Sequence, residues 1–273
     1  MSKVVLITGA SSGIGKETAK QLLQDGHVVY GAARRVEKMA DLQALGVKVL
    51  ALDVTEEQSM TEAVNHILKT EGRIDVLINN AGFGSYGAFE EMPMAEARYQ
   101  MEVNVFGTAR LTQLVLPAMI EHRFGRIINI SSVGGKVALA LGSWYHASKF
   151  ALEALSDSLR NEVKQYGVDV VVIEPGGIQS EWAGIAVDNL VKVSGKGRYR
   201  QMVERYALRR TNMGENAFAD PGVIAELIRE AITAAQPQTR YAAGYLAEEV
   251  LSLRKQLSDR ELDERLHSYL KIN

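Results

Sequence analysis

The chain has 273 residues, 47% of them hydrophobic, and its 31 basic and 33 acidic side chains leave a formal charge of −2 at neutral pH. This length and apolar content suit a single α/β domain with a large core, and the balanced charge gives no sign of nucleic-acid binding. Because the chain has no cysteine, disulfides, thiol nucleophiles and cysteine-ligated metals are excluded. The five histidines form no close pair, so we expect no metal site.

Short apolar segments, several of them rich in β-branched residues, predict seven buried strands. These segments are Val4–Ile7, Val28–Ala32, Val47–Leu52, Ile74–Ile78, Arg126–Ile130, Val168–Ile173 and Arg240–Ala243. Amphipathic stretches predict helices at Gly15–Asp25, Glu56–Thr70, Ala95–His122, Ser148–Tyr166 and from about Asp220. Strands that alternate with helices form parallel sheets with right-handed crossovers. We therefore predict an α/β fold, a doubly wound (Rossmann) seven-stranded parallel sheet with helices on both faces, in a single domain over residues 1–273.

The start of the chain bears on its location. The first predicted strand begins at Val4, which leaves no room for a signal peptide before it. No apolar run reaches the ~20 residues that a membrane-spanning helix needs. We therefore expect a cytoplasmic protein with neither a membrane nor a nucleic acid among its partners.

A glycine-rich turn, which reads TGASSGIG over residues 8–15, connects the first strand to the first helix. A strand, a glycine turn and a helix in this order form a phosphate site, because glycines let the backbone approach a pyrophosphate and the helix N-terminus offers free N–H groups. The spacing differs from Gly-x-Gly-x-x-Gly. A generic turn is the alternative, which the position after the first strand makes the weaker interpretation. The predicted phosphate-binding residues are Gly9, Ser11, Ser12, Gly13, Ile14 and Gly15.

Tyr145 and Lys149 are spaced four residues apart, which places them on one face of a helix. A tyrosine titrates near ~10 in water, and a neighbouring cation lowers that pKa toward neutral pH. Ser132, after the fifth predicted strand, can hold the same substrate oxygen as the tyrosine. The trio predicts proton transfer on a carbonyl or alcohol oxygen, although a Tyr-x-x-x-Lys pair alone is more often a solvated helix face.

Together these motifs resemble the short-chain dehydrogenase/reductase family, from Val4 to about Ser180. The glycine turn is similar to the family's cofactor turn, residues 79–82 (NNAG) to its second signature, and residues 175–180 (PGGIQS) to its segment beside the nicotinamide. The resemblance implies four catalytic residues, Asn104, Ser132, Tyr145 and Lys149, of which Asn104 positions a water for proton relay and Lys149 also holds the nicotinamide ribose. It implies further cofactor contacts from Tyr145, Asn80, Ala81, Gly82, Pro175, Gly176, Ile178 and Ser180.

The residues after the second predicted strand distinguish NADP from NAD. NAD-preferring members of the family resemble one another in carrying an aspartate where this chain has Ala33, and Arg34 and Arg35 follow directly. A guanidinium suits the 2′-phosphate of NADP and gains nothing from a hydroxyl, although both arginines could be ordinary loop charges. We therefore predict NADP(H) as the cofactor. By resemblance, Asp53 and Val54 lie at the adenine, and Thr55 is the better candidate for the cap of the next helix.

Residues 181–216 interrupt the alternation of strands and helices and carry several glycines and a basic run, Arg198–Arg210. The segment leaves the carboxyl end of the sixth strand, where ligands bind in such sheets, so we interpret it as a substrate lid rather than a surface excursion. The predicted substrate pocket is mostly apolar, with no basic residue clearly directed at a carboxylate or phosphate. Its residues are Phe83, Tyr86, Val133, Leu139 and Trp182, with Met92 or Met213 as further candidates.

These observations predict an NADP(H)-dependent oxidoreductase that transfers a hydride between nicotinamide and a carbonyl or secondary alcohol. A weaker resemblance to the hydroxysteroid-dehydrogenase-like branch, in residues 132–135 and in the lid length, favours a fairly large apolar substrate. A cofactor-sensing regulator on the same fold is one alternative, although such a protein would usually lack Tyr145 or Lys149. A sugar-nucleotide epimerase or dehydratase is another, although its glycine turn usually differs.

Three structural expectations complete the hypothesis. His146 is adjacent to Tyr145, and adjacent helix positions do not face each other, so we expect it to pack or to lie at the surface. Asn104 has a structural alternative, a buried helix–helix hydrogen bond. By resemblance, the helices Ala95–His122 and Ser148–Tyr166 pair across a two-fold axis, which predicts a homodimer or homotetramer.

Overall fold

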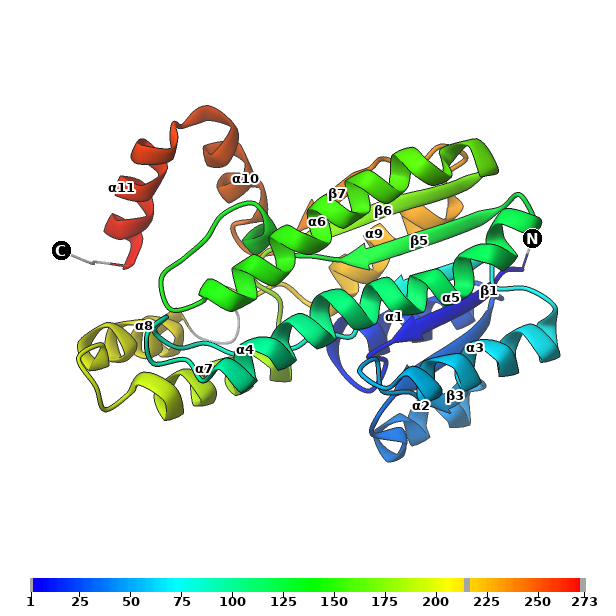
Figure 1. Cartoon of the computed structure of the whole chain (residues 1–273), viewed down its shortest axis with the longest axis horizontal. Helices are drawn as coiled ribbons and strands as arrows, with labels where there is room; N and C mark the ends of the chain where they lie inside the picture. The colour runs from blue at the N-terminus through cyan, green and yellow to red at the C-terminus, as the bar shows by residue number, and fades with distance from the viewer. Residues whose placement is uncertain (1, 214–216, 271–273) are drawn as a thin grey trace.

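The computed structural model describes residues 2–213 and 217–270, except for the side chains of residues 182–183, 210–213 and 269–270. Seven parallel strands form one sheet in the order β3-β2-β1-β4-β5-β6-β7. The strands are β1 (Val4–Thr8), β2 (Val28–Ala33), β3 (Lys48–Ala51), β4 (Val76–Asn79), β5 (Gly125–Ile130), β6 (Val168–Pro175) and β7 (Arg240–Ala243). This arrangement confirms the predicted doubly wound parallel sheet (Figure 1).

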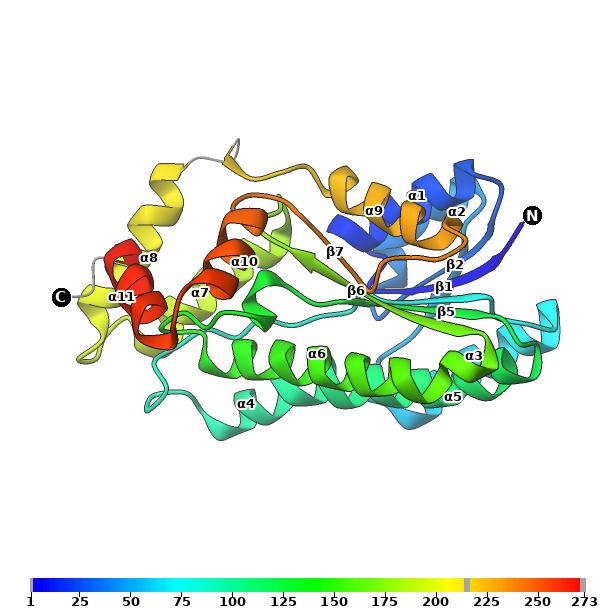
Figure 2. The ribbon, with the colours of Figure 1, turned by 90° about the horizontal axis from the view of Figure 1, so that it is seen from above.

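Helices cover both faces of the sheet (Figure 2). On one face lie α1 (Gly13–Gln24), α2 (Ala40–Leu45) and α9 (Pro221–Thr233), and on the other α3 (Glu57–Glu71), α4 (Met94–Met101), α5 (Thr108–Glu121) and α6 (Ser143–Val163). Side chains of a strand alternate between faces. Val5 and Ile7 accordingly join a core cluster with α1 and α9, whereas Val4 and Leu6 join a second cluster with α3 and α5.

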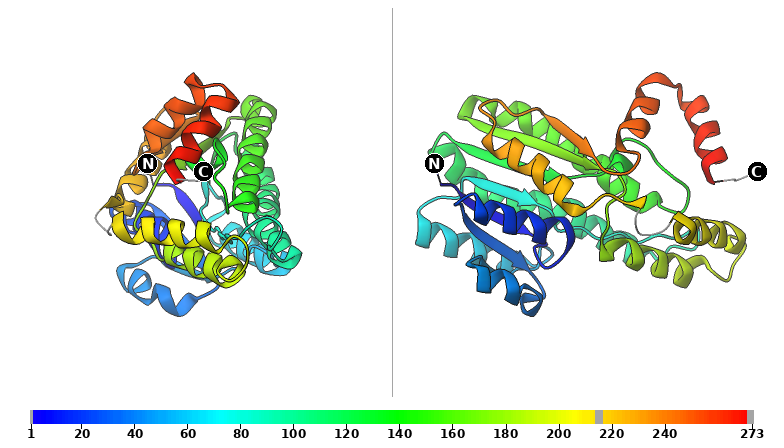
Figure 3. Two further views of the ribbon diagram at one scale, coloured as in Figure 1. Left: turned by 90° about the vertical axis from the view of Figure 1, so that its left-hand side faces the viewer. Right: turned by 180° about the vertical axis from the view of Figure 1, so that it is seen from behind.

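Four more helices lie beyond the carboxyl ends of the strands (Figure 3). They are α7 (Glu181–Ser194), α8 (Arg200–Met213), α10 (Ala247–Gln256) and α11 (Asp259–Leu270). The predicted lid segment is therefore largely a pair of helices, α7 and α8. The sequence-based prediction contained neither α2 nor the C-terminal pair α10 and α11.

Two predicted helix boundaries change near the chemistry. The helix that carries Tyr145 begins at Ser143 rather than at Ser148, so the tyrosine lies in its first turn. The predicted helix Ala95–His122 is α4 and α5 joined by a π-helical segment, η2 (Glu102–Gly107), which contains Asn104. Single π-turns inside α-helices occur frequently at functional sites.

The helical stretch Met94–Glu121 bears on the membrane prediction. Among the described residues it is the one helix long and apolar enough to cross a membrane, and 50% of the relevant window is buried inside the protein. The expectation that no apolar run reaches this length was therefore wrong. A core helix that packs against a sheet meets the same criterion, so the finding is weak evidence for a membrane span.

The strand order positions the site. β1 and β4 are neighbours, but the chain leaves β1 for α1 on one face and leaves β4 toward α4 and α5 on the other. Ligands of open α/β sheets bind in the crevice at such a topological switch point, outside the carboxyl ends of the strands.

Candidate active site

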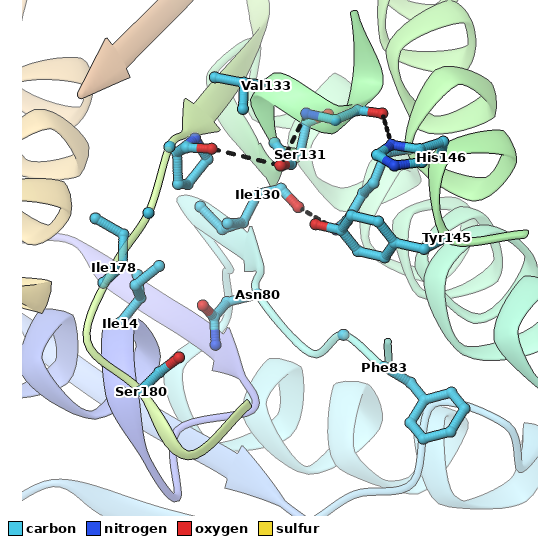
Figure 4. Close-up of a pocket in the computed structure, with 18 of the residues that line it drawn as sticks. Ile14, Asn80, Phe83, Ile130, Ser131, Val133, Tyr145, His146, Ile178 and Ser180 are labelled. Atoms are coloured by element: carbon cyan, nitrogen blue, oxygen red, sulfur yellow. Dashed lines mark hydrogen bonds between the residues drawn. The ribbon is translucent and has the colours of Figure 1, made fainter. Parts of the chain in front are cut away.

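A cavity of about 710 Å³ lies at this edge of the sheet and contains most of the predicted site (Figure 4). Its walls include predicted residues from the glycine turn, the ends of β2 to β6 and the start of α6. These residues are Gly9, Ser11, Ser12, Gly13, Ile14, Arg34, Arg35, Asp53, Val54, Asn80, Ala81, Gly82, Phe83, Tyr86, Ser132, Val133, Leu139, Tyr145, Lys149, Pro175, Gly176, Ile178 and Ser180. Gly15, Asn104 and Met92 are not among the wall residues, and the side chains of Trp182 and Met213 lie outside the described part of the chain.

The glycine turn is held in shape by the end of β4. The side-chain Nδ2 of Asn80 donates to the backbone carbonyls of Thr8 (2.9 Å) and Gly9 (3.2 Å). The Thr8 hydroxyl accepts from the backbone N–H groups of Asn80 and Ala81. Gly9 has φ +67°, and a Cβ there would come within 2.9 Å of the Ala81 Cα, so a larger residue would be strained. Gly15 packs beneath the turn, against Asn80 and Gly9.

The N-terminus of α1 opens into the cavity. Ser12, its N-cap, makes no side-chain cap hydrogen bond, which leaves the N–H groups of the first turn available to a ligand. Together with the close backbone approach at Gly9, this geometry fits a pyrophosphate.

Arg34 and Arg35 directly follow β2, which pairs with β1 beside the glycine turn, and both are about half exposed. Arg34 Nη1 donates to the Tyr99 hydroxyl (2.7 Å) and lies 4.0 Å from the Asp53 carboxylate. Asp53 Oδ1 accepts hydrogen bonds from the Thr55 backbone and hydroxyl. Thr55 is therefore not the N-cap of α3, contrary to the prediction. Its hydroxyl donates to Asp53, and Glu56 occupies the N-cap position.

Tyr145 and Ser132 meet at the centre of the cavity. Tyr145 is 8% exposed, and burial raises the pKa of its phenol to about 12, while a hydrogen bond with Ser132 acts to lower that pKa. The Ser132 hydroxyl accepts from the Gly134 backbone (3.0 Å) and donates to the Pro175 carbonyl (3.4 Å). The two hydroxyls thus converge on one point, where a substrate oxygen can be held.

Lys149 lies one turn further along α6 and is also buried. Its ammonium donates to the Ile130 carbonyl (2.8 Å), and burial lowers its pKa to about 8, opposed by the charge of Glu153. The expected lowering of the Tyr145 pKa by Lys149 is not seen, because Lys149 does not contribute to the tyrosine's shift. In this arrangement burial dominates the pKa of both groups.

Asn104 adopts the structural role that the sequence left as an alternative. Its Oδ1 accepts from the Phe83 backbone, and its Nδ2 donates to the Phe83 carbonyl (both 2.8 Å) and to the Ser148 hydroxyl (2.9 Å). The side chain therefore ties α6 to the loop after β4. Its Oδ1 and the Lys149 Nζ both lie within 4 Å of the Cβ position of Gly82, so both side chains border Gly82.

The apolar end of the cavity contains Tyr86, whose ring lies 5.5 Å from that of Tyr145 and 6.0 Å from that of Tyr206 on α8. His146 also lines this end. Its Nδ1 pairs with the Gly134 carbonyl (2.9 Å), and burial lowers its pKa, so the ring is neutral at neutral pH. This agrees with the expected packing role.

Sequence reasoning missed the wall supplied by the C-terminal part of the chain. Side chains from α8 to α11 line the cavity, namely Tyr206, Arg209, Phe218, Tyr245, Leu246, Glu249, Val250, Leu253, Arg265, Leu266 and Ser268. Two arginines therefore border a pocket in which we expected no directed basic residue. One signal was available in the sequence: Leu246, Val250 and Leu253 follow one another at helical spacing.

Comparisons with known proteins agree with this geometry. A family model described as short chain dehydrogenase matches residues 3–189. A 3-ketodihydrosphingosine reductase of Bacteroides thetaiotaomicron is 44% identical over 174 residues, which cover 64% of this chain and 63% of that protein. An uncharacterised oxidoreductase of Escherichia coli, YbbO, is 32% identical over 267 residues, which cover 97% of this chain and 94% of that protein. The match to the reductase thus spans less than two thirds of its length.

Solved structures show the same similarity. A short-chain dehydrogenase from Streptomyces avermitilis has a TM-score of 0.80 at 34% identity, over 100% of this chain and 99% of that chain. An actinorhodin polyketide ketoreductase variant with NADPH has a TM-score of 0.76 at 28% identity, over 89% and 95%. A Burkholderia phymatum protein in complex with NAD shares the fold, with a TM-score of 0.80 at 23% identity over 97% and 95%.

Proposed function

The chain belongs to the short-chain dehydrogenase/reductase family of oxidoreductases, and we propose that it uses NADP(H) to reduce the carbonyl of a large apolar ketone, or to oxidise the matching alcohol. One observation carries this proposal. Ser132 and the buried Tyr145 and Lys149 lie in the same cavity as a glycine turn with left-handed backbone at Gly9 and the open N-terminus of α1.

The residues present fit a nicotinamide dinucleotide. The glycine turn and the first turn of α1 would hold the pyrophosphate, Asp53 and Val54 the adenine end, and Pro175, Ile178 and Ser180 the nicotinamide end. When bound, the cofactor supplies or accepts a hydride at its nicotinamide ring. The protein must then orient the substrate and manage one proton.

Ser132 and Tyr145 perform those tasks. The Ser132 hydroxyl hydrogen-bonds the substrate oxygen and fixes its position. Because the Tyr145 pKa of about 12 keeps its phenol protonated at neutral pH, the phenol is set to donate a proton to the oxygen during reduction. Lys149, with its pKa near 8, exchanges its proton more readily than an exposed lysine and can serve in reprotonating the tyrosine.

The preference for NADP(H) rests on the residues after β2. Ala33 offers no carboxylate to the ribose, and the half-exposed guanidinium groups of Arg34 and Arg35 border the cavity. Arg34 can exchange its hydrogen bond with Tyr99 for a charge-assisted contact to a 2′-phosphate. The polyketide ketoreductase that holds NADPH supports this choice.

The apolar ketone rests on the cavity's far end. Tyr86, Val133 and Leu139 line it, and Tyr145 faces the same space, whereas the Phe83 ring packs on Tyr99, which is hydrogen-bonded to Arg34. The relative named 3-ketodihydrosphingosine reductase supports a ketone on a long apolar molecule. Cytoplasmic location and assembly as a homodimer or homotetramer remain predictions.

A panel of ketones and alcohols, assayed by the absorbance of NADPH, tests the proposal. We expect net NADPH consumption with apolar ketones and much less with small polar ones. Tight NADPH binding without turnover of any compound would favour the cofactor-sensing regulator. Conversion of a sugar nucleotide without net NADPH consumption would favour an epimerase.

A further inference from the structure

The catalytic cavity continues past Tyr145 to the two C-terminal helices, which lie beyond the matched family region at residues 3–189. Tyr245, just before α10, exchanges two backbone hydrogen bonds with Gly177 (3.0 and 3.1 Å) in the segment after β6. Helix α10 also contacts β7 and the short 3-10 helix η3 (Val133–Gly135), which follows Ser132. The helix is therefore fixed beside the catalytic serine.

The side of α10 toward the cavity is apolar. Val250 and Leu253 are three residues apart, which places them on one helix face, and Leu246 is the residue that caps the helix. All three line the cavity and are only partly buried. On α11, Leu262 is 6% exposed, and Leu266, one turn later, lines the cavity. The C-terminal pair thus presents an apolar stripe to the space in front of Tyr145.

Aromatic side chains complete the same space. The rings of Tyr206 of α8 and Tyr86 are tilted, with centroids 6.0 Å apart, and Phe218 meets Tyr245 edge to face at 5.8 Å. We call the space lined by Tyr206, Phe218, Leu246, Val250, Leu253 and Leu266 the apolar corridor. Figure 3 shows α10 and α11 at the same end of the sheet as α7 and α8.

We propose that the apolar corridor binds the hydrocarbon chain of the substrate, so that α10 and α11 select ketones by chain length. The dinucleotide cradle at Gly9, Arg34 and Asp53 is the polar part of the cavity, whereas the corridor has an apolar lining beside Ser132. Apolar surface that faces a cavity is stabilised when an apolar ligand covers it. Arg209 and the exposed Glu249 and Arg265 border the corridor, and we place its opening to solvent at Glu249 and Arg265.

This inference rests on the proposed ketone reduction, and it makes a quantitative expectation. Each methylene that enters the corridor should raise kcat/KM about fourfold, the value of one buried methylene. The increase should stop once the chain reaches solvent. A series of straight-chain methyl ketones of increasing length, assayed with NADPH, measures both the slope and the limit.

Two substitutions on α10 form a matched pair. Leu253→Trp fills the corridor and should move the length limit to shorter ketones. Ser252→Trp adds the same side chain at the neighbouring exposed position and should leave the length profile unchanged. Leu253→Ala is less demanding sterically and serves as the test if Leu253→Trp fails to fold. It should reduce the gain in kcat/KM per methylene. Fluorescence titration with NADPH shows whether each variant keeps its cofactor site.

The outcomes separate the two levels of the proposal. If the wild type turns over no ketone, the proposed function fails. If it reduces ketones with a length profile that neither Leu253 variant alters, the proposed function stands and the corridor assignment is overturned. The assignment is also overturned if Leu253→Trp changes the oligomeric state in light scattering but not the length profile, because the stripe would then be an interface between copies of the chain.

Discussion

Lys149 and Glu153 lie one turn apart on α6, both buried, and the Glu153 carboxylate opposes the burial that lowers the pKa of Lys149 to about 8. Glu153 is itself held by Lys136 and Arg240, each 3.0 Å away. Lys149 is therefore kept in an environment that disfavours its charge, and the neighbouring Glu153 carboxylate reduces that cost. Such perturbed groups are typical of functional sites.

This burial predicts a pH dependence of stability. An unfolded chain binds the lysine proton up to about pH 10.5, whereas the folded protein releases it near pH 8. Between these values the unfolded state holds more protons, so the free energy of unfolding should rise with pH. Below about pH 8 the lysine is charged in both states, and the full destabilisation by its buried charge is present. Lys149→Met should stabilise the protein at pH 7 by up to about 3 kcal/mol, since each pKa unit is worth ~1.4 kcal/mol.

Urea unfolding of both proteins at pH 7 and pH 9.5 measures this effect. The rise of wild-type stability over that range should be smaller in Lys149→Met. Lys69→Met, at an exposed position, is the control and should follow the wild type. A Lys149→Met protein that is less stable than the wild type at pH 7 would contradict the account.

Tyr145→Phe tests the proton donor. The variant keeps the aromatic ring that packs near Tyr86 but removes the hydroxyl, so the rate of ketone reduction should fall by about two orders of magnitude or more. NADPH affinity, measured by fluorescence titration, should stay close to that of the wild type. Near-normal turnover on a good substrate would show that Tyr145 is not the acid.

Arg34→Ala tests the choice of cofactor. Loss of a charge-assisted contact to the 2′-phosphate should weaken NADPH binding by ~1.5–3 kcal/mol, while NADH binding should barely change. Arg73→Ala, remote from the cavity walls, is the control. Equal losses for both cofactors, or a native preference for NADH, would refute the assignment.

The pair α7 and α8 should behave as a lid. Leu190 and Val203 join Tyr86 and Leu141 in a small cluster separate from the two sheet cores, so the pair can open without disturbing the sheet. Hydrogen exchange over residues 181–213 should slow more with NADPH and a ketone together than with NADPH alone. Equal protection in every state would identify a fixed wall.

Two exposed aromatic side chains on neighbouring helices allow a test of the predicted assembly into a homodimer or homotetramer. Phe106 on η2 is 57% exposed and Phe150 on α6 is 44% exposed, and η2 and α6 are in contact. Exposed large apolar side chains on neighbouring helices favour association. Light scattering should show a homodimer or homotetramer, and Phe150→Glu should shift it toward a monomer. A wild type that is monomeric at micromolar concentration would falsify the prediction.

The amino-acid sequence by itself was enough for the fold, and it singled out Ser132, Tyr145 and Lys149, which the structure brings to one cavity. Buried parallel strands such as Val168–Ile173 appear as continuous apolar runs, and a left-handed turn at Gly9 requires glycine whatever surrounds it. Helical spacing placed Tyr145 and Lys149 on one face before the helix start was known. These features depend on residues close together in the chain.

Only the tertiary structure decided how those residues behave. The pKa values of Tyr145 and Lys149 depend on burial by segments far away in the chain, and this reversed the expected lowering of the tyrosine pKa. The hydrogen bonds of Asn104 to Phe83 and Ser148, and the wall that α10 and α11 add to the cavity, join residues distant in sequence. Local spacing carries no information on such contacts, because desolvation and packing are set by which surfaces the folded chain brings together.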